Sequence, residues 1–133
     1  QRLQKPIEQQ LHLLLQRIQH PSAVTKIALP TMEGLQMISI DSIISCESES
    51  NYTVVFLHNK RKIVVSRTLK EIEELLEDYT MLRVHRCYLV NLNEVEKYIK
   101  GEGGYLIMSD GSTIDVSKSR KELLMQKLQP SKF

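Results

Sequence analysis

Short runs of β-favouring residues, separated by turn-forming residues, follow one another through most of this 133-residue chain. Each run is too short for a typical helix, and several alternate apolar with polar side chains, as half-buried strands do. The runs occupy residues 24–29, 35–40, 43–48, 52–57, 62–65, 81–84, 88–91, 95–100, 105–108 and 113–116. The pattern predicts a mainly β fold of about ten short strands in one domain.

Turn chemistry supports this interpretation at two places. The dipeptide Asp110-Gly111 is a strong signal for a tight hairpin between the last two runs. Residues 30–34, which read Pro-Thr-Met-Glu-Gly, predict a turn between the first two runs. We therefore expect a hairpin between the last two runs and a turn between the first two.

One amphipathic helix interrupts the strand series. Leu69, Ile72, Leu75 and Leu76 recur at helical spacing, and we expect this stripe to face the sheets. The T-x-x-E sequence that begins at Thr68 predicts a capping box, in which the threonine and the glutamate three residues later cap the helix start reciprocally.

A second helix is predicted at the end of the chain. Leu123, Leu124 and Leu128 form its apolar stripe, and Ser117 or Ser119 is placed to cap its first turn.

The first 22 residues predict a helix of a different kind. Ile7, Leu11, Leu14, Leu15 and Ile18 give residues 7–18 an apolar stripe that is too short to be stable without a packing partner. Three partners are equally reasonable: the same domain, an upstream domain, or a second copy of the chain. We expect residues 1–22 to be a linker helix from a missing upstream domain, and residues 23–133 to form the β domain.

Composition excludes several classes of protein. The sequence contains no nucleophile elbow, phosphate-binding loop or dinucleotide fingerprint, and no Cys/His pattern with metal-ligand spacing, so we expect neither an enzyme nor a cofactor or metal. Cys46 and Cys87 are expected to be reduced thiols, as in the cytosol. No apolar run reaches the ~20 residues that span a bilayer, and no signal peptide is present, so a cytoplasmic location without membrane contact is expected.

The net charge of +2 is modest, but the cations cluster near turns. Arg83, His85 and Arg86 form a basic corner, and the amide of Asn91 follows it. Arginine forks and amides match base edges and phosphates, whereas hydroxyl groups suit phosphates. Three predicted loop tips carry such groups: Ser50/Asn51, His85/Arg86 and Ser117/Lys118/Arg120. The pattern favours double-stranded DNA as the partner.

Each candidate also has a structural interpretation. Asn51 suits a turn with a left-handed backbone, Arg86 is able to pair with Glu74 or Glu77, and Lys118 suits a solvated first turn of a helix. His85 is expected to brace the corner through hydrogen bonds.

Three segments of the chain, taken in order, resemble the signatures of one family. Residues 43–52 read IISCESESNY, residues 83–91 read RVHRCYLVN, and residues 104–118 read GYLIMSDGSTIDVSK. They are similar to E-[SA]-x-x-[ND]-Y, to [FL]-x-R-x-H-R-S-[YF]-[LIV]-V-N and to G-x-x-L-x-x-x-D-G-x-x-[IV]-x-V-S-[RK]. These are signatures of the LytTR DNA-binding domains, the output half of many bacterial two-component response regulators. The resemblance runs from about residue 24 to residue 128.

The resemblance implies a fold of small packed sheets whose loops enter successive major grooves of bent DNA. Matched position by position, the residues that read bases are Asn51, Arg86 and Lys118. Lysine replaces the commoner arginine at position 118 and offers a point charge instead of a bidentate fork. The further candidates for DNA contact are Ser50, His85, Ser117, Arg120 and Arg67.

The expected function is therefore transcriptional regulation by sequence-specific DNA binding, at promoter sites that carry paired repeats. The expected partners are DNA, a missing N-terminal receiver or sensor domain, and a second copy of the chain on DNA. The competing interpretation is a β module that binds an acidic protein or ligand through the basic corner. A steep salt dependence and competition by duplex DNA would separate the two. A weak esterase or nuclease is a third interpretation, which an absence of turnover would dismiss.

Overall fold

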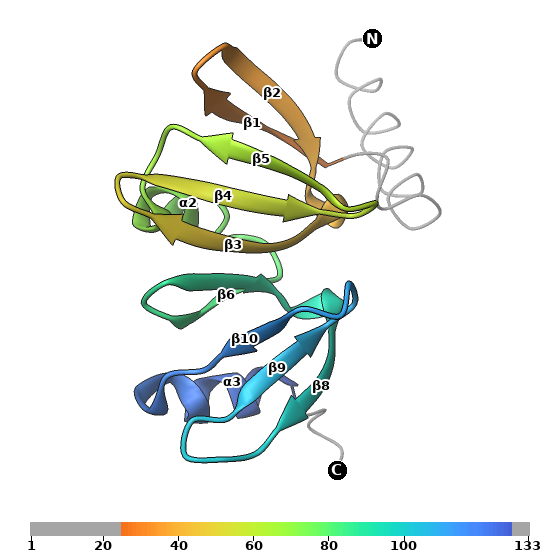
Figure 1. Ribbon diagram of the computed structural model, residues 1–133, viewed down its shortest axis with the longest axis vertical. Coiled ribbons are helices and arrows are strands. Elements are labelled where there is room, and N and C mark those ends of the chain that lie inside the picture. The colour runs from red at the N-terminus through yellow and green to blue at the C-terminus, as the bar shows by residue number, and fades with distance from the viewer. Residues whose placement is uncertain (1–24, 129–133) are drawn as a thin grey trace, which may run out of the picture.

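The computed structural model describes residues 25–128, and their elements follow the predicted order (Figure 1). The strands are β1 (Lys26–Thr31), β2 (Gly34–Ser39), β3 (Ile43–Glu49), β4 (Tyr52–Leu57), β5 (Arg61–Val65), β6 (Met81–His85), β7 (Tyr88–Asn91), β8 (Val95–Ile99), β9 (Tyr105–Met108) and β10 (Thr113–Asp115). The helices are α2 (Leu69–Leu75) and α3 (Lys121–Leu128), with short 3₁₀ turns η2 (Ile40–Ser42), η3 (Leu92–Glu94) and η4 (Lys118–Arg120). The mainly β prediction is confirmed. The predicted helix at 7–18 and the division at residue 22 lie outside the described residues.

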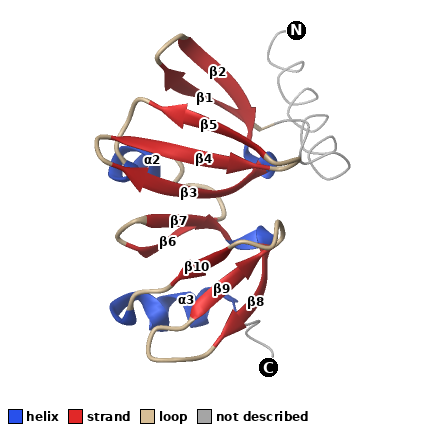
Figure 2. Cartoon of the chain, in the orientation of Figure 1, coloured by secondary structure: helices blue, strands red, loops and turns tan. Residues whose placement is uncertain are grey.

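The strands form three small antiparallel sheets. The central sheet has the order β5-β4-β3-β7-β6, a second sheet has the order β10-β9-β8, and β1 pairs with β2 alone. Figure 2 shows the β1–β2 pair above the central sheet and the β8–β10 sheet below it. Hairpin connections between consecutive strands explain most of this pairing.

Two hydrophobic clusters pack on the central sheet. The first joins it to α2 and the β1–β2 pair, and consists of Ile27, Leu29, Ile38, Ile40, Ile43, Cys46, Val55, Leu57, Val65, Leu69, Ile72, Leu76 and Leu89. The second joins β3, β6 and β7 to β9, β10 and α3, and consists of Ile44, Val84, Val90, Leu106, Met108, Ile114, Val116 and Leu124. The two clusters hold the strand ends, and therefore the loops, in fixed relative positions.

Helix α2 begins as predicted, but its apolar stripe is narrower. The side chain of Thr68 accepts a hydrogen bond from the Glu71 backbone N–H, and the Glu71 carboxylate accepts one from the Thr68 N–H, which completes the capping box. Leu69, Ile72 and Leu76 are buried, whereas Leu75 is 47% exposed. At 3.6 residues per turn, Leu75 lies about 60–120° around the helix from the other three. The prediction that Leu75 faces the sheets is therefore wrong.

The end of the chain also differs in detail. A 3₁₀ turn, η4, precedes α3, and Ser117 flanks η4 without a side-chain capping bond. The Ser117 hydroxyl instead lies 3.4 Å from the Ser119 hydroxyl, so the predicted serine cap of the last helix is wrong. In α3, Leu124 is buried but Leu123 is 43% exposed.

Two turns explain where the observed strands differ from the predicted ones and where they agree. Strand β1 continues through Pro30 to Thr31 because it is one edge of a two-stranded sheet, where a residue without an N–H is tolerated. The Asp110-Gly111 hairpin is confirmed. Gly111 has a φ of 86°, and the Asp110 carboxylate accepts hydrogen bonds from the Ser112 N–H and hydroxyl.

Candidate nucleic-acid interface

The first two predicted loop tips lie side by side at one end of the central sheet. Ser50 and Asn51 form the turn between β3 and β4, where Glu49 pairs with Tyr52. Arg86 and Cys87 form the turn between β6 and β7. The Ser48 N–H donates to the Cys87 carbonyl at 2.9 Å, which joins the two turns directly.

The third loop tip lies beyond the edge strand β6. The Ser117 N–H donates to the Val84 carbonyl at 2.8 Å, and Nη1 of Arg120 donates to the Arg83 carbonyl at 3.2 Å. These contacts hold η4, which contains Lys118, next to the β6–β7 turn. In Figure 1 the β3–β4 turn, the β6–β7 turn and η4 all lie on the left side of the molecule. Fold and local hydrogen bonds therefore bring the three predicted tips to one side.

Arg67 reaches the same side from β5. Thr53 pairs with Val65, so the residues that follow β5 lie beside the start of β4 and the first turn. The Thr53 hydroxyl donates to the Arg67 carbonyl at 2.8 Å, while the Arg67 side chain is exposed and donates from Nη1 to the Ser66 carbonyl.

The three side chains expected to read bases are exposed. Asn51, Arg86 and Lys118 are solvent-accessible and make no side-chain hydrogen bond or ion pair with residues 25–128. No residue within 25–128 occupies their hydrogen-bond donors, so these donors are available to a bound ligand. Ser50, with a φ of 56°, is the residue with the left-handed backbone in this turn, so the interpretation of Asn51 as a left-handed turn residue is wrong.

The acidic helix pairs with a different arginine from the one expected. Nη1 of Arg83 lies 2.7 Å from Oε1 of Glu73, and the Arg83 side chain is only 14% exposed. Neither Glu74 nor Glu77 forms an ion pair with Arg86 among the described residues. Arg83 is thus the inward-facing cation of the basic corner and Arg86 the outward-facing one.

His85 braces the corner, as its position predicts. The Cys87 N–H donates to Nδ1 of His85 at 3.1 Å, so the acceptor nitrogen faces the turn and the remaining ring N–H is Nε2. The imidazole also packs at a tilt on Tyr88, with 5.4 Å between ring centroids. The histidine thereby stabilises the turn that carries Arg86.

Asn91, the amide in the signature, is buried and satisfied within the fold. It is 1% exposed, and its Nδ2 donates to the Ile43 carbonyl at 2.9 Å. Its Oδ1 accepts from the Thr80 hydroxyl and from the Asn93 N–H. Sequence reasoning grouped Asn91 with the donors of the basic corner, but its role is structural.

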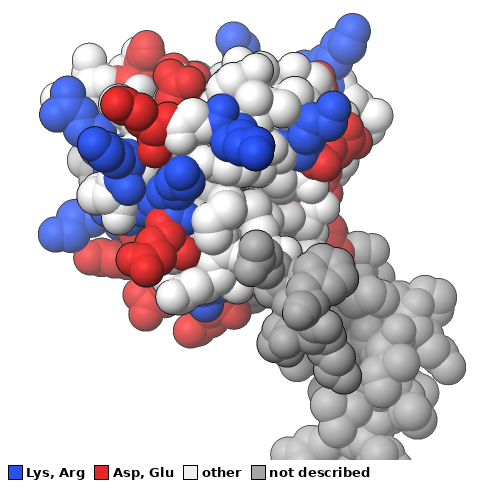
Figure 3. All heavy atoms as spheres, turned by 90° about the horizontal axis from the view of Figure 1, so that it is seen from below, with Lys and Arg blue, Asp and Glu red and all other residues white. Residues whose placement is uncertain are grey.

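Side chains of both charge signs surround the loops. Seen from the end that carries α3, Lys and Arg side chains lie along the left side of the molecule, the side on which the loops lie in Figure 1, among acidic side chains, and further Lys and Arg side chains lie across the middle and upper right (Figure 3). Helix α2 carries three glutamates, Glu71, Glu73 and Glu74. Hydrogen bonds from Thr68, first from its backbone N–H and then from its hydroxyl, lower the pKa of Glu71, and the nearby charge of Arg67 adds to the effect.

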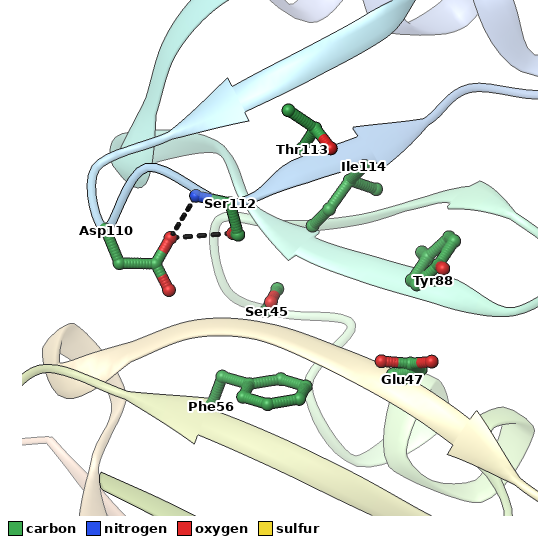
Figure 4. Close-up of a pocket in the computed structure, with 8 residues that line it drawn as sticks. All are labelled: Ser45, Glu47, Phe56, Tyr88, Asp110, Ser112, Thr113 and Ile114. Carbon is green, nitrogen blue, oxygen red and sulfur yellow. Dashed lines mark hydrogen bonds between the residues drawn. The ribbon is translucent and has the colours of Figure 1, made fainter. Parts of the chain in front are cut away.

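A small groove lies between the central sheet and the β9–β10 hairpin (Figure 4). It measures about 110 Å³ and is lined by Ser45, Glu47, Phe56, Tyr88, Asp110, Ser112, Thr113 and Ile114. Burial raises the pKa of the Tyr88 hydroxyl, and the carboxylates of Glu47 and Asp115 raise it further. An acidic groove of this size does not suit a phosphate backbone, so we do not assign it to the candidate interface.

Residues 25–128 offer neither a metal-binding cluster nor a membrane-spanning helix. That part of the chain holds no cluster of three or more His, Cys, Asp or Glu side chains that is arranged to bind a metal ion. None of its helices is both long enough and apolar enough to cross a membrane.

Known proteins resemble this chain in sequence and in fold. It is 36% identical over 104 residues to the sensory transduction protein LytT of Bacillus subtilis, a match that covers 74% of this chain and 42% of that protein. It is 30% identical over 103 residues to LytT of Bacillus cereus, which covers 74% of this chain and 41% of the relative. The chain thus spans about two fifths of the length of these curated relatives.

The fold comparison and the family comparison agree. A solved LytTr DNA-binding domain from Bacillus cereus superimposes with a TM-score of 0.67 at 23% identity, over 80% of this chain and 98% of that domain. The sequence profile of the LytTr DNA-binding domain matches residues 33–129, which include the β3–β4 turn, the β6–β7 turn and η4. The chain therefore belongs to the LytTr family of DNA-binding domains.

Proposed function

We propose that this chain reads specific double-stranded DNA sequences through the β3–β4 turn, the β6–β7 turn and η4, which enter successive major grooves from one side. The observation that carries the proposal is that Asn51, Arg86 and Lys118 are exposed and unpartnered within residues 25–128, and that the three loops that carry them lie on the same side of the molecule. An asparagine matches the edge of adenine, an arginine fork matches guanine, and a lysine donates to guanine as a point charge.

Other groups on the same side suit the phosphate backbone. Ser50 and Ser117 offer hydroxyl groups, and the exposed Arg67 offers a guanidinium. Arg120 is half-buried and uses one N–H of its fork on the Arg83 carbonyl, so its other donors are available for phosphate. The Nε2–H of His85 is a further candidate. Contacts of this kind position the loops without reading sequence.

The deciding experiment measures the affinity of the wild type and of Arg86→Ala by fluorescence anisotropy, on a duplex selected from a random pool and on a scrambled duplex. Arg86→Ala is expected to cost ~1–3 kcal/mol on the selected duplex and to relax specificity at one base pair. Arg61→Ala is the matched control, because Arg61 is exposed at the opposite end of the central sheet. Equal losses on both duplexes would mean that Arg86 contacts only phosphate.

Substitutions of Lys118 test the third loop. Lys118→Ala should weaken binding to the selected duplex, whereas Lys118→Arg should preserve or strengthen it, because the guanidinium can bind a guanine through two hydrogen bonds. If Lys118→Ala binds both duplexes as tightly as the wild type and with the same salt dependence, Lys118 is a solvated lysine and the third contact is wrong.

The alternative interpretation, a module that binds an acidic protein, makes a different prediction about salt. DNA binding releases counterions, so log K should fall by about 0.9 per phosphate contact for each tenfold rise in salt. A salt-insensitive affinity for duplex DNA, or a bound acidic ligand that the selected duplex does not displace, would favour the alternative.

In the cell, we expect the chain to act as the cytoplasmic output domain of a transcriptional regulator in a two-component system. The relatives named as sensory transduction proteins are longer than this chain, which supports an upstream receiver or sensor domain joined through residues 1–22. We expect two copies to bind paired repeats at promoters. Sequencing the genomic fragments that the chain retains would test this, because enriched fragments should carry two copies of one motif.

A further inference from the structure

The side chain of Arg83 lies within the β6–β7 hairpin and binds the turn that carries Arg86. Its Nε donates to the His85 carbonyl at 3.0 Å, and its Nη2 donates to the Arg86 carbonyl. Its Nη1 donates to the Glu73 carboxylate at 2.7 Å, and the side chain is only 14% exposed. The guanidinium therefore connects two successive carbonyls of the turn to helix α2.

This arrangement depends on the geometry of arginine. The planar fork presents several N–H groups in fixed directions, so it can bind two neighbouring carbonyls and a carboxylate at once. A lysine ammonium carries the same charge but cannot reproduce the fork. Because hydrogen bonds with a charged donor are strong, the backbone of the turn is held in one orientation. The direction in which the Arg86 side chain leaves the turn is fixed by the same contacts.

The same network extends to the neighbouring loops. The Cys87 backbone contacts both Nδ1 of His85 and the N–H of Ser48, which joins the turn to β3 near the first loop. On the other side, Arg120 donates to the Arg83 carbonyl, and the Ser117 N–H donates to the Val84 carbonyl, which joins the turn to η4. All three loops are thus connected through the backbone of residues 83–87.

We propose that Arg83 is a positioning residue, which does not touch DNA but sets the geometry in which Arg86 meets its base. The proposal rests on the proposed function, in that Arg86 must read a base for its direction to matter. It assigns the two arginines of the basic corner to different tasks: Arg83 orders the turn from inside, and Arg86 contacts DNA from outside.

Four variants test the proposal. Arg83→Gln removes the fork and the charge, Arg83→Lys keeps the charge alone, and Glu73→Gln removes the ion pair but keeps both carbonyl contacts. Arg61→Gln removes one exposed positive charge at the far end of the central sheet and serves as the control. Affinities for the selected and the scrambled duplex are measured across a range of salt concentrations, together with the thermal midpoint of each variant.

Arg83→Gln and Arg83→Lys are both expected to weaken binding to the selected duplex by roughly 5- to 150-fold, the range of a lost base contact. Binding to the scrambled duplex should change by less than about threefold, and the salt slope should stay that of the wild type, because no phosphate contact is lost. Glu73→Gln should have a smaller effect than either. Recovery of specific binding by Arg83→Lys would overturn the proposal, since charge alone would then suffice.

Two further results would contradict it. A salt slope reduced by about one unit in Arg83→Gln would mean that Arg83 contacts a phosphate itself. Equal losses on both duplexes, accompanied by a lower thermal midpoint, would mean a general structural role.

A measurement on the wild type keeps the proposal testable if the variants unfold. In an NMR exchange experiment, the Nε–H of Arg83 should exchange with water much more slowly than that of the exposed Arg86, because it is bound to the His85 carbonyl. Equal exchange rates would refute the contact. If the wild type binds the selected and scrambled duplexes equally, the proposed function fails, while this exchange result still reports on the Arg83 contacts.

Discussion

Replacing the buried Asn91 with alanine should destabilise the domain more than the loss of any other single polar side chain in the β6–β7 hairpin. Asn91 is 1% exposed and makes three side-chain hydrogen bonds, to the Ile43 carbonyl, the Thr80 hydroxyl and the Asn93 N–H. In Asn91→Ala the Ile43 carbonyl loses its side-chain donor inside the core, at a cost of about 1–3 kcal/mol. The lost bond to the Asn93 N–H adds about 0.5–1.5 kcal/mol, whereas the exposed Thr80 hydroxyl can turn to water.

The expected total is a loss of about 2–4 kcal/mol in the free energy of unfolding, measured by urea denaturation followed by circular dichroism. Since 1 kcal/mol lowers the Tm of a domain of this size by roughly 4–8 °C, a fall of roughly 8–32 °C is expected. Asn93→Ala is the matched control, because the Asn93 side chain is exposed and makes one long hydrogen bond, 3.3 Å, to Thr80. The reasoning is refuted if Asn91→Ala costs less than about 1 kcal/mol, or if Asn93→Ala costs as much.

Three other outcomes follow from burial and charge. Ile72→Ala should lower the free energy of unfolding by about 2–5 kcal/mol because Ile72 is 1% exposed. Leu75→Ala should lower it by less than about 1 kcal/mol because Leu75 is 47% exposed. Equal losses for the two variants in denaturant titrations would contradict the burial pattern of α2. Burial raises the pKa of the Cys46 thiol to about 12, so in native protein at pH 8 a thiol reagent should modify Cys87 and leave Cys46 intact, as mass spectrometry of the digest would show. The lowered pKa of Glu71 means that its carboxylate stabilises the fold above the ordinary value of 4.5, and that this contribution is lost as the pH falls through the lowered pKa. The Tm difference between the wild type and Glu71→Gln should therefore shrink in acid, and a constant difference would mean that the carboxylate charge does not stabilise the helix start.

Local signals predicted the elements well because the relevant interactions are local. Thr68 and Glu71 fix the start of α2 through contacts three residues apart, and Asp110-Gly111 fixes a hairpin within one turn. Leu75 shows the limit of such signals. Its spacing fits a helical stripe, but a seven-residue helix needs only a narrow contact face against the sheet, and the width of that face depends on tertiary packing.

The outline of the candidate site was predictable from the sequence, but its details were not, because they depend on contacts between distant segments. The sequence places cations and amides at turns, so the three loop tips were identified from the chain alone. It does not show which arginine of the basic corner faces inward, because that depends on α2 passing β6 and on the irregular β6–β7 register between Arg83 and His85. Pairings between Glu73 and Arg83, or between Arg120 and the Arg83 carbonyl, join segments that no local pattern connects.

The distribution of charge favours sequence selectivity in DNA binding over high affinity for any DNA. A net charge of +2 and an acidic helix next to the loops limit the sequence-independent attraction to phosphates, which supplies most non-specific DNA binding. Discrimination must then come from a few base contacts, and such contacts are effective only if their side chains are well placed before binding. The two turns that carry Asn51 and Arg86 meet this need, because their backbones are joined to each other and to the sheets while their side chains remain unpartnered within residues 25–128. Under the proposed function, such loops would lose little backbone conformational entropy on binding DNA, so a short set of loops could replace a recognition helix.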